Sequence, residues 1–142
     1  MKTILFLLLS ISIYSASAQK TKIYQQKSVA IKGYDAVSYF DEGMPIEGKK
    51  EYSRDWKGAT WYFSSKQHAE LFASNPEQYT PQFGGYCAYA ASQGYLYRSD
   101  PNVWKIVDGK LYLNYDTGTQ QKWTDNQSEL IQLGLKNWPT FF

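Results

Sequence analysis

The fold is indicated most clearly by a stretch that reads Trp56-Lys57-Gly58-Ala59-Thr60-Trp61-Tyr62-Phe63-Ser64. Aromatic and polar residues alternate on both sides of Lys57-Gly58-Ala59, as in two antiparallel strands joined by a tight turn. Either Ser64 or Ser65 can cap a following helix, expected over Lys66 to Ser74, because a serine oxygen accepts from the free N–H groups of a first turn. The stretch therefore predicts a β-hairpin followed directly by a capped helix.

Further strands and helices are predicted before and after this stretch. The further predicted strands are Ser28 to Lys32, Ala36 to Phe40, Val103 to Val107 and Lys110 to Tyr115. The last two flank Asp108-Gly109, a strong signal for a hairpin turn. The further predicted helices are Tyr86 to Gln93 and Gly118 to Leu135, the second interrupted near Thr124 and Asp125. Strands and helices interleave without βαβ regularity, so we predict a small α+β domain with short antiparallel hairpins and several helices.

The first eighteen residues are interpreted as a signal peptide. Lys2 supplies a positive charge, Ile4 to Ile13 form an apolar stretch, and Ala16-Ser17-Ala18 is the small-x-small pattern of a cleavage site. A membrane span needs roughly 20 apolar residues, and this stretch is too short. We therefore expect a mature chain of residues 19–142 with no membrane span, located outside the cytoplasm, either periplasmic or secreted.

Composition bounds the remaining possibilities. The chain has 142 residues with 15 basic and 13 acidic side chains, and no basic stripe is found, so a nucleic-acid-binding surface is not expected. The 13 Tyr and 5 Trp predict an aromatic-rich core. Residues 19–142 have the length of one domain, and neither an internal repeat nor a long linker is expected to divide them.

Cys87 is the only cysteine of the chain, and it lies in the run Phe83-Gly84-Gly85-Tyr86-Cys87-Ala88. An exported protein normally pairs its cysteines or lacks them, so a single thiol there needs an explanation. Two adjacent glycines suggest a turn that leads into a helix, where free N–H groups favour a thiolate. Cys87 is therefore the first candidate for a reactive or metal-binding residue, with a buried inert thiol as the alternative.

Further candidates accompany this thiol. His68, the only histidine, is either a metal ligand, a base for Cys87, or a half-buried core residue. Asp35 is either a turn-forming residue or a carboxylate at the mouth of a pocket. The pocket that we predict around the sulfur is lined by Tyr34, Asp35, Tyr86 and Tyr89, with ordinary core packing as the alternative.

Several motifs together resemble the YHS-domain family, in its small exported single-domain branch. The resemblance covers nearly all of the mature chain, and its most specific part is the Gly-Gly-Tyr-Cys-Ala run. The matching stretches are Gly33-Tyr34-Asp35-Ala36-Val37-Ser38-Tyr39-Phe40, Trp56 to Ser64, Asn75-Pro76-Glu77-Gln78-Tyr79, Pro81 to Tyr89 and Asp108 to Tyr115.

The resemblance implies a treble-clef-like core and an association with metal. It places the three cysteines of related metal sites on Ser38, Ser64 and His68. Because serine is a poor ligand for soft or borderline metals, we expect this zinc-type site to be lost. Related proteins of the exported branch are often selenoproteins, with selenocysteine at the position of Cys87, which implies that this position reacts or binds metal.

We therefore predict an exported domain that binds a soft transition metal, copper in the first place, with Cys87 as principal ligand and His68 as candidate second ligand. One alternative is a redox protein in which Cys87 is the catalytic thiol and is oxidised to a sulfenic acid. Another is a structural or interaction domain without chemistry. Whether the protein is an enzyme stays open, and so does the identity of any metal-handling or redox partner protein.

Overall fold

The computed structural model describes residues 22–142, so the predicted signal peptide at residues 1–18 lies outside the described residues. The described chain is a small single domain of mixed helix and sheet, which confirms the predicted α+β class. None of its helices combines the length and the apolar character that crossing a membrane requires.

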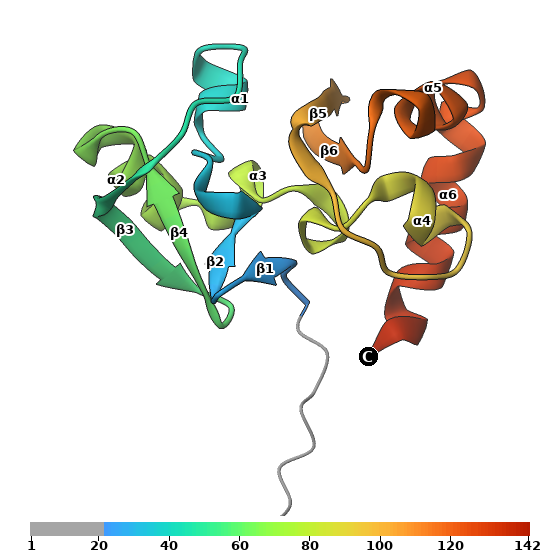
Figure 1. Cartoon of the computed structure of the whole chain (residues 1–142), viewed down its shortest axis with the longest axis horizontal. Coiled ribbons are helices and arrows are strands. Elements are labelled where there is room, and N and C mark those ends of the chain that lie inside the picture. Colours follow the sequence, from blue (N-terminus) through green and yellow to red (C-terminus); the bar gives the residue numbers. More distant parts are fainter. Residues whose placement is uncertain (1–21) are drawn as a thin grey trace, which may run out of the picture.

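The strands form two small sheets, one of four strands in the order β1-β2-β4-β3 and one formed by β5 and β6 (Figure 1). In chain order the elements are β1 (Gln25–Gln26), β2 (Val29–Ala30), η1 (Ile31–Gly33), α1 (Ser38–Asp41), β3 (Lys49–Trp56), β4 (Ala59–Phe63), α2 (Lys66–Ser74), α3 (Pro76–Tyr79), η2 (Gln82–Gly85), α4 (Ala88–Ser92), β5 (Asp100–Val107), β6 (Lys110–Asn114), α5 (Thr117–Asp125), α6 (Gln127–Asn137) and η3 (Trp138–Phe141).

Both predicted hairpins and the capped helix are confirmed. Of the two candidate caps it is Ser65 that accepts a hydrogen bond, from the N–H of His68 at 3.1 Å. The predicted interruption of the C-terminal helix is also found, because α5 ends at Asp125 and α6 begins at Gln127. The turn and short helix expected around Cys87 are present as η2 and α4, with Cys87 at the N-cap of α4.

The predicted strand at Ala36 to Phe40 is wrong, because this segment enters α1. The buried side chain of Asp35 accepts from the N–H of Val37 at 2.8 Å and from the N–H of Ser38 at 3.3 Å. Such bonds from an aspartate to the backbone just after it favour a turn and a helix start over an extended strand. Apolar residue types alone do not reveal this competition.

The chain contains two copies of one structural unit, which makes the expectation of no internal repeat wrong. The first hairpin spans residues 49–56 and 59–63, and the second spans 100–107 and 110–114, a shift of 51 residues. The helices after the hairpins, at 66–74 and 117–125, keep the same shift. Both hairpins have a register irregularity at the same place, before Ser53 in one and before Trp104 in the other.

The turn that opens each copy has an unusual backbone in both. Ile31, Lys32 and Gly33 have φ values of 49°, 48° and 84°, and the corresponding residues 83–85 have 55°, 59° and 84°. In both turns a tyrosine N–H donates, at 2.9 Å, to the carbonyl oxygen of the residue three positions earlier. The donor is Tyr34 in the first copy and Tyr86 in the second. Left-handed backbone is rare in L-residues, so its recurrence at matching places supports a duplication.

The sequence conceals the duplication because most of its side chains have changed. Gly-Tyr at 33–34 recurs at 85–86, and Ala36 recurs as Ala88, but the residue between them is Asp35 in the first copy and Cys87 in the second. The conserved architecture rests on backbone turns and on apolar character, which many sequences satisfy.

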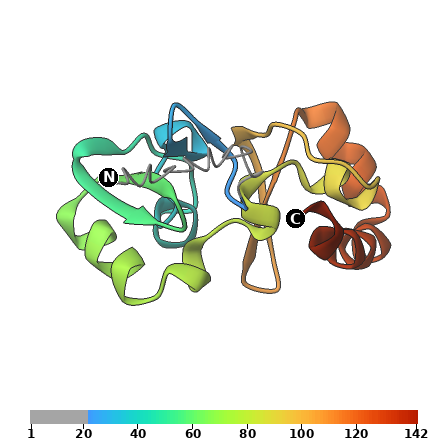
Figure 2. The ribbon, with the colours of Figure 1, turned by 90° about the horizontal axis from the view of Figure 1, so that it is seen from below.

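Each copy has its own aromatic core. Trp61 packs on Phe72 with ring centroids 5.0 Å apart in the first copy, and Tyr112 packs on Trp123 at 5.1 Å in the second. Leu111 and Leu113 of the second hairpin belong to the apolar cluster of the first copy, so the copies share part of one core. The first copy lies mainly at the left of Figures 1 and 2 and the second at the right.

Candidate functional site

A buried carboxylate organises the polar site of the first copy. Asp35 is fully buried, and its Oδ2 lies 2.6 Å from Nδ1 of His68 and 2.6 Å from Oγ of Ser64. The backbone N–H of Ser64 also donates to Oδ2, at 2.8 Å. Together with the N–H groups of Val37 and Ser38, these contacts satisfy a carboxylate that is out of contact with water.

The first cradle is the name we use for the backbone N–H groups of Val37, Ser38 and Ser64, which surround the Asp35 carboxylate. Two of them come from the start of α1 and the third from the end of β4. An ionised carboxylate accepts hydrogen bonds and donates none, so three converging N–H donors match this form of Asp35.

His68 is held between this carboxylate and two exposed ones. Its side chain is 8% exposed, and its other ring nitrogen, Nε2, lies 3.4 Å from Oε1 of Glu42 and 3.9 Å from Oδ2 of Asp41. The side chains of Asp41 and Glu42 are 43% and 41% exposed. The imidazole therefore connects a buried acid on one side with two acids at the surface on the other.

The three positions that the family resemblance assigns to cysteines do meet in space, but they do not fit a thiolate metal site. Ser64 and His68 both donate toward Oδ2 of Asp35, and the hydroxyl of Ser38 donates to the Asp35 carbonyl oxygen at 2.8 Å. The central atom of this cluster is Oδ2 of Asp35, an acceptor that already has its hydrogen-bond donors. Hydroxyls and a buried carboxylate are not the soft ligand set of a zinc-type site.

Cys87 is buried in the second copy, with 1% of its surface exposed. Its sulfur lies 3.5 Å from Oδ1 of Asn114, a fully buried amide. Burial raises the pKa of the Cys87 thiol, although the backbone N–H groups of Ala90, Tyr115 and Tyr89 act on the sulfur in the opposite direction. Burial therefore outweighs the helix start that was expected to favour a thiolate.

The second cradle is the name we use for those three N–H groups, of Tyr89, Ala90 and Tyr115. The N–H of Tyr89 donates to Oδ1 of Asn114 at 2.9 Å, and the side chain of Cys87 forms no cap hydrogen bond with the start of α4. The three N–H groups correspond to the first cradle position by position. In each copy two groups come from the second and third residues after the cradled side chain, and the third comes from the residue after the second hairpin strand. Cys87 thus occupies the place that Asp35 occupies in the first copy.

The structure does not bring Cys87 and His68 together. His68 lies on α2 and Cys87 at the start of α4, and these two helices are at opposite sides of the molecule in Figures 1 and 2. In the second copy the position of His68 is taken by Thr119. Cys87 and His68 therefore do not form one site, and each has a separate set of neighbours.

The tyrosines predicted to line a pocket around the sulfur have other neighbours too. Tyr34 pairs with Glu47 in a single antiparallel bridge. The ring of Tyr86 stacks against Tyr24 at 5.4 Å, and Tyr89 packs against the apolar cluster of the second copy. The backbone N–H of Tyr89 donates to Oδ1 of Asn114 at 2.9 Å, and this oxygen also lies 3.5 Å from the sulfur.

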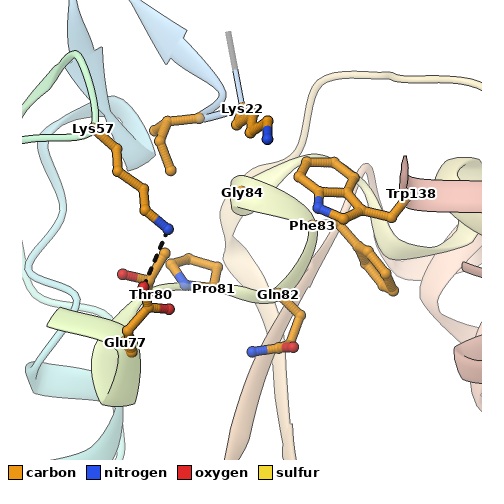
Figure 3. Close-up of a pocket in the computed structure, with 10 residues that line it drawn as sticks. Lys22, Lys57, Glu77, Thr80, Pro81, Gln82, Phe83, Gly84 and Trp138 are labelled. Carbon is orange, nitrogen blue, oxygen red and sulfur yellow. Dashed lines mark hydrogen bonds and ion pairs between the residues drawn. The ribbon is translucent and has the colours of Figure 1, made fainter. Parts of the chain in front are cut away.

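A cavity of about 160 Å³ lies at the seam between the copies (Figure 3). Its walls include Trp138, Gly84 and the ion pair of Lys57 with Glu77, whose Nζ and Oε1 are 3.1 Å apart. An open groove of about 580 Å³ is lined by Tyr62, Lys27 and Lys32 among others. Neither space is lined by Cys87, Asp35 or His68.

Residues of both sites were missed from the sequence. The sequence patterns did not single out Asp41 and Glu42, and Asn114 lies inside the strand that they predict over Lys110 to Tyr115. The available signal was the recurrence of Gly-Tyr-x-Ala after 52 residues, which aligns Asp35 with Cys87 and would have pointed to a common backbone environment. The partners of that environment come from distant segments, which the motif does not specify.

Comparison with protein families matches residues 37–83 to the model described as "YHS domain". No curated protein and no solved structure matches the chain. The matched segment contains Ser38, Ser64 and His68, and it ends at Phe83, where the second copy begins. Cys87 lies outside it.

Proposed function

Because the chain is a YHS domain-containing protein, we propose that it is a metal-handling module that binds a divalent transition-metal ion through Nε2 of His68, with Glu42 and Asp41 as further ligands. The arrangement that supports this proposal is the buried Asp35 carboxylate on Nδ1 of His68, at 2.6 Å, with the two acids facing Nε2. Metal-binding histidines commonly have this order of groups, a carboxylate on one nitrogen and the ion on the other.

The contact with Asp35 determines which ring nitrogen is free to bind. A buried carboxylate at 2.6 Å can only accept, so Nδ1 of His68 carries the proton. In the neutral imidazole, Nε2 then presents a lone pair toward the carboxylates of Glu42 and Asp41. Three electron-rich groups that face one another favour a metal cation between them.

The distances suit an ion of the size of zinc or copper. Two ligand atoms that are each about 2.05 Å from a tetrahedral ion lie about 3.3 Å apart. The separation between Nε2 of His68 and Oε1 of Glu42 is 3.4 Å. Asp41, at 3.9 Å, needs a small side-chain rotation, which its exposure permits. In residues 22–142 no three His, Cys, Asp or Glu side chains are already placed to hold a metal ion, so the side chains of Asp41 and Glu42 have to rotate for this site to form.

Titration of the mature protein with Cu(II) and with Zn(II), followed by calorimetry, tests the proposal. Imidazole with carboxylates accepts both ions, and copper binds more tightly in the usual affinity order. We expect one ion per chain, with His68→Gln abolishing binding and Glu42→Gln weakening it at least tenfold. Glu47→Gln is the matched control, since this exposed acid is nearby in the chain, and should bind as the unchanged protein does. Equal binding by the His68→Gln variant would contradict the proposal.

Cys87 with Cu(I) is the second candidate, and the presence of a single thiol in the chain is the observation that favours it. Cu(I) prefers a thiolate and accepts few ligands. Because the thiol is buried, binding here requires local opening of the chain. Cys87→Ser should then abolish Cu(I) binding and leave Cu(II) binding unchanged. A protein that takes up no Cu(I) under reducing conditions excludes this candidate.

The proposal includes export, with cleavage between residues 18 and 19. An extracytoplasmic domain meets metal ions directly and is not kept reduced by cytoplasmic thiols. N-terminal sequencing of the protein recovered after secretion should begin at Gln19. An intact Met1 in all of the recovered protein would contradict export by this signal.

A further inference from the structure

The cavity at the seam between the copies points to a second binding site: we propose that it takes up a small organic carboxylate whose apolar body is the size of one ring (Figure 3). The observations are the volume of the cavity, an aromatic wall with an indole N–H that has no partner, and one positive charge that no acid of the lining neutralises. The proposal is independent of metal binding by His68, which does not line this cavity.

Contacts between distant segments hold the walls of the cavity together. The N–H of Tyr24 donates to the carbonyl oxygen of Gly84 at 2.9 Å. A Cβ at Gly84 would overlap the carbonyl oxygen of Lys22, so these two stretches of backbone touch. In another wall Nζ of Lys57 lies 3.1 Å from Oε1 of Glu77, which joins the turn between β3 and β4 to α3. The cavity is therefore formed by the fold itself and does not need a ligand to create it.

One side of the cavity is apolar and flat. The indole of Trp138 packs against the rings of Phe83 and Phe142, with centroids 5.9 Å and 5.0 Å away, and these contacts hold it in place. The buried ring of Pro81 adds a second apolar surface. The cavity volume of about 160 Å³ is close to the volume of about 150 Å³ at which an apolar cavity takes up one benzene molecule. The size therefore suits one six-membered ring with a small substituent.

The indole N–H of Trp138 requires an acceptor in the ligand. Its Nε1 forms no hydrogen bond within residues 22–142. In Figure 3 this nitrogen lies on the edge of the ring that is turned toward Gly84, another residue of the lining. An indole nitrogen donates and does not accept. A ligand that packs on this wall therefore gains a hydrogen bond if it carries an oxygen beside its ring.

The charges of the lining select an anion. Its ionisable residues are Lys22, Lys57 and Glu77. Glu77 neutralises Lys57, whose Nζ also lies 4.5 Å from the ring centre of Trp56. Lys22 forms no ion pair within the described part of the chain, and its Nζ lies 5.8 Å from the ring centre of Phe142. A carboxylate, with two acceptor oxygens and one negative charge, matches both this ammonium and the indole N–H.

Benzoate, benzyl alcohol and benzylamine test the ligand class on the unchanged protein, because they share one ring and differ in charge. Binding is followed in NMR spectra of the ¹⁵N-labelled protein through the indole signal of Trp138, which is identified by its loss in Trp138→Phe. We expect millimolar benzoate to shift this signal and to bind about threefold more tightly than benzyl alcohol, as one exposed ion pair allows. Benzylamine should bind more weakly than either. No shift with benzoate, or benzylamine that binds as tightly as benzoate, overturns the proposal.

Two lysine variants test where the charge acts. Lys22 and Lys27 are both exposed, but Lys27 lines the separate groove beside Tyr62. We expect Lys22→Gln to lower the benzoate affinity about threefold, to that of benzyl alcohol, and Lys27→Gln, the matched control, to leave it unchanged. Added salt should weaken benzoate binding in the unchanged protein and have little effect in Lys22→Gln. Equal benzoate affinities of the two variants overturn the proposal.

Discussion

The two copies of the unit hold different groups in the same backbone setting. In the first copy the cradle surrounds the side-chain carboxyl group of Asp35, which also orients His68. In the second copy the matching position holds the buried thiol of Cys87, and Thr119 stands where the histidine would be. The comparison shows that one backbone arrangement holds a hydrogen-bonded carboxylate in the first copy and a buried thiol in the second, and that the side chains decide whether a histidine lies beside it.

The difference also separates two kinds of candidate chemistry in one small domain. The first copy has a histidine whose free nitrogen faces two acids at the surface. The second copy has a thiol that is closed off from water and has no histidine beside it. A common Cys-His site is therefore replaced by two independent sites.

The largest effect is expected where the first cradle loses its anion. Asp35→Asn keeps the shape but places an NH2 group among donors, so Ser64, His68 and the N–H groups lose acceptors. Removing one partner of a buried polar pair typically costs about 3–5 kcal/mol of unfolding free energy, and we expect a loss in this range. Chemical denaturation at pH 7 measures it. A loss below that of Cys87→Ala would contradict the dominance of the first cradle.

The next effect compares matching positions of the two opening turns, Gly84 and Lys32. Both have left-handed φ, 59° and 48°, but a Cβ at Gly84 would overlap the carbonyl oxygen of Lys22, whereas Lys32 is exposed. Gly84→Ala should cost about 3 kcal/mol from overlap and backbone strain together. Lys32→Ala, the matched control, should stay within about 0.5 kcal/mol of the unchanged protein. Equal effects in thermal unfolding would mean that the seam near Lys22 is not tightly packed.

Cys87→Ala should have a smaller effect than Asp35→Asn, because no charge is removed and the cavity is small. We expect a loss of about 1–2 kcal/mol. The unchanged protein should also lose stability as the pH rises above about 8.5, the ordinary thiol value, because burial raises the pKa of the folded thiol and only the unfolded chain ionises there. Melting temperatures between neutral and alkaline pH check this, and a Cys87→Ala variant with the same alkaline loss would contradict it.

The smallest effect concerns the caps of the two equivalent helices. Asp116 accepts from the N–H of Thr119 at 2.7 Å, where the first copy uses the neutral Ser65. This hydrogen bond lowers the pKa of Asp116 in the folded state. The cap therefore stabilises the fold above the ordinary aspartate pKa of about 3.9, and this stabilisation is lost as the pH falls through the lower pKa of the folded state. Asp116→Ser should slightly reduce the fall in melting temperature at acidic pH. An unchanged fall would show that this cap does not contribute measurably to the pH dependence of stability.

Local patterns were sufficient to predict both hairpins, the Ser65-capped helix and the break between α5 and α6, because turn residues, caps and helical periodicity act over a few residues. The same patterns failed at Ala36 to Phe40, where the Asp35 side chain redirects the backbone. They also failed to reveal the duplication, since backbone dihedral angles and packing can persist after the side chains have changed.

The sequence by itself determined the kinds of groups available: one thiol, one histidine, and a Gly-Tyr-x-Ala motif that occurs twice. Tertiary structure alone decided their surroundings, because Ser64 and Asp35 are 29 residues apart and Asn114 and Cys87 are 27 residues apart. Hydrogen bonding and desolvation depend on such distant partners. They make Asp35 the acceptor that orients His68, and they enclose Cys87 in the position of a carboxylate.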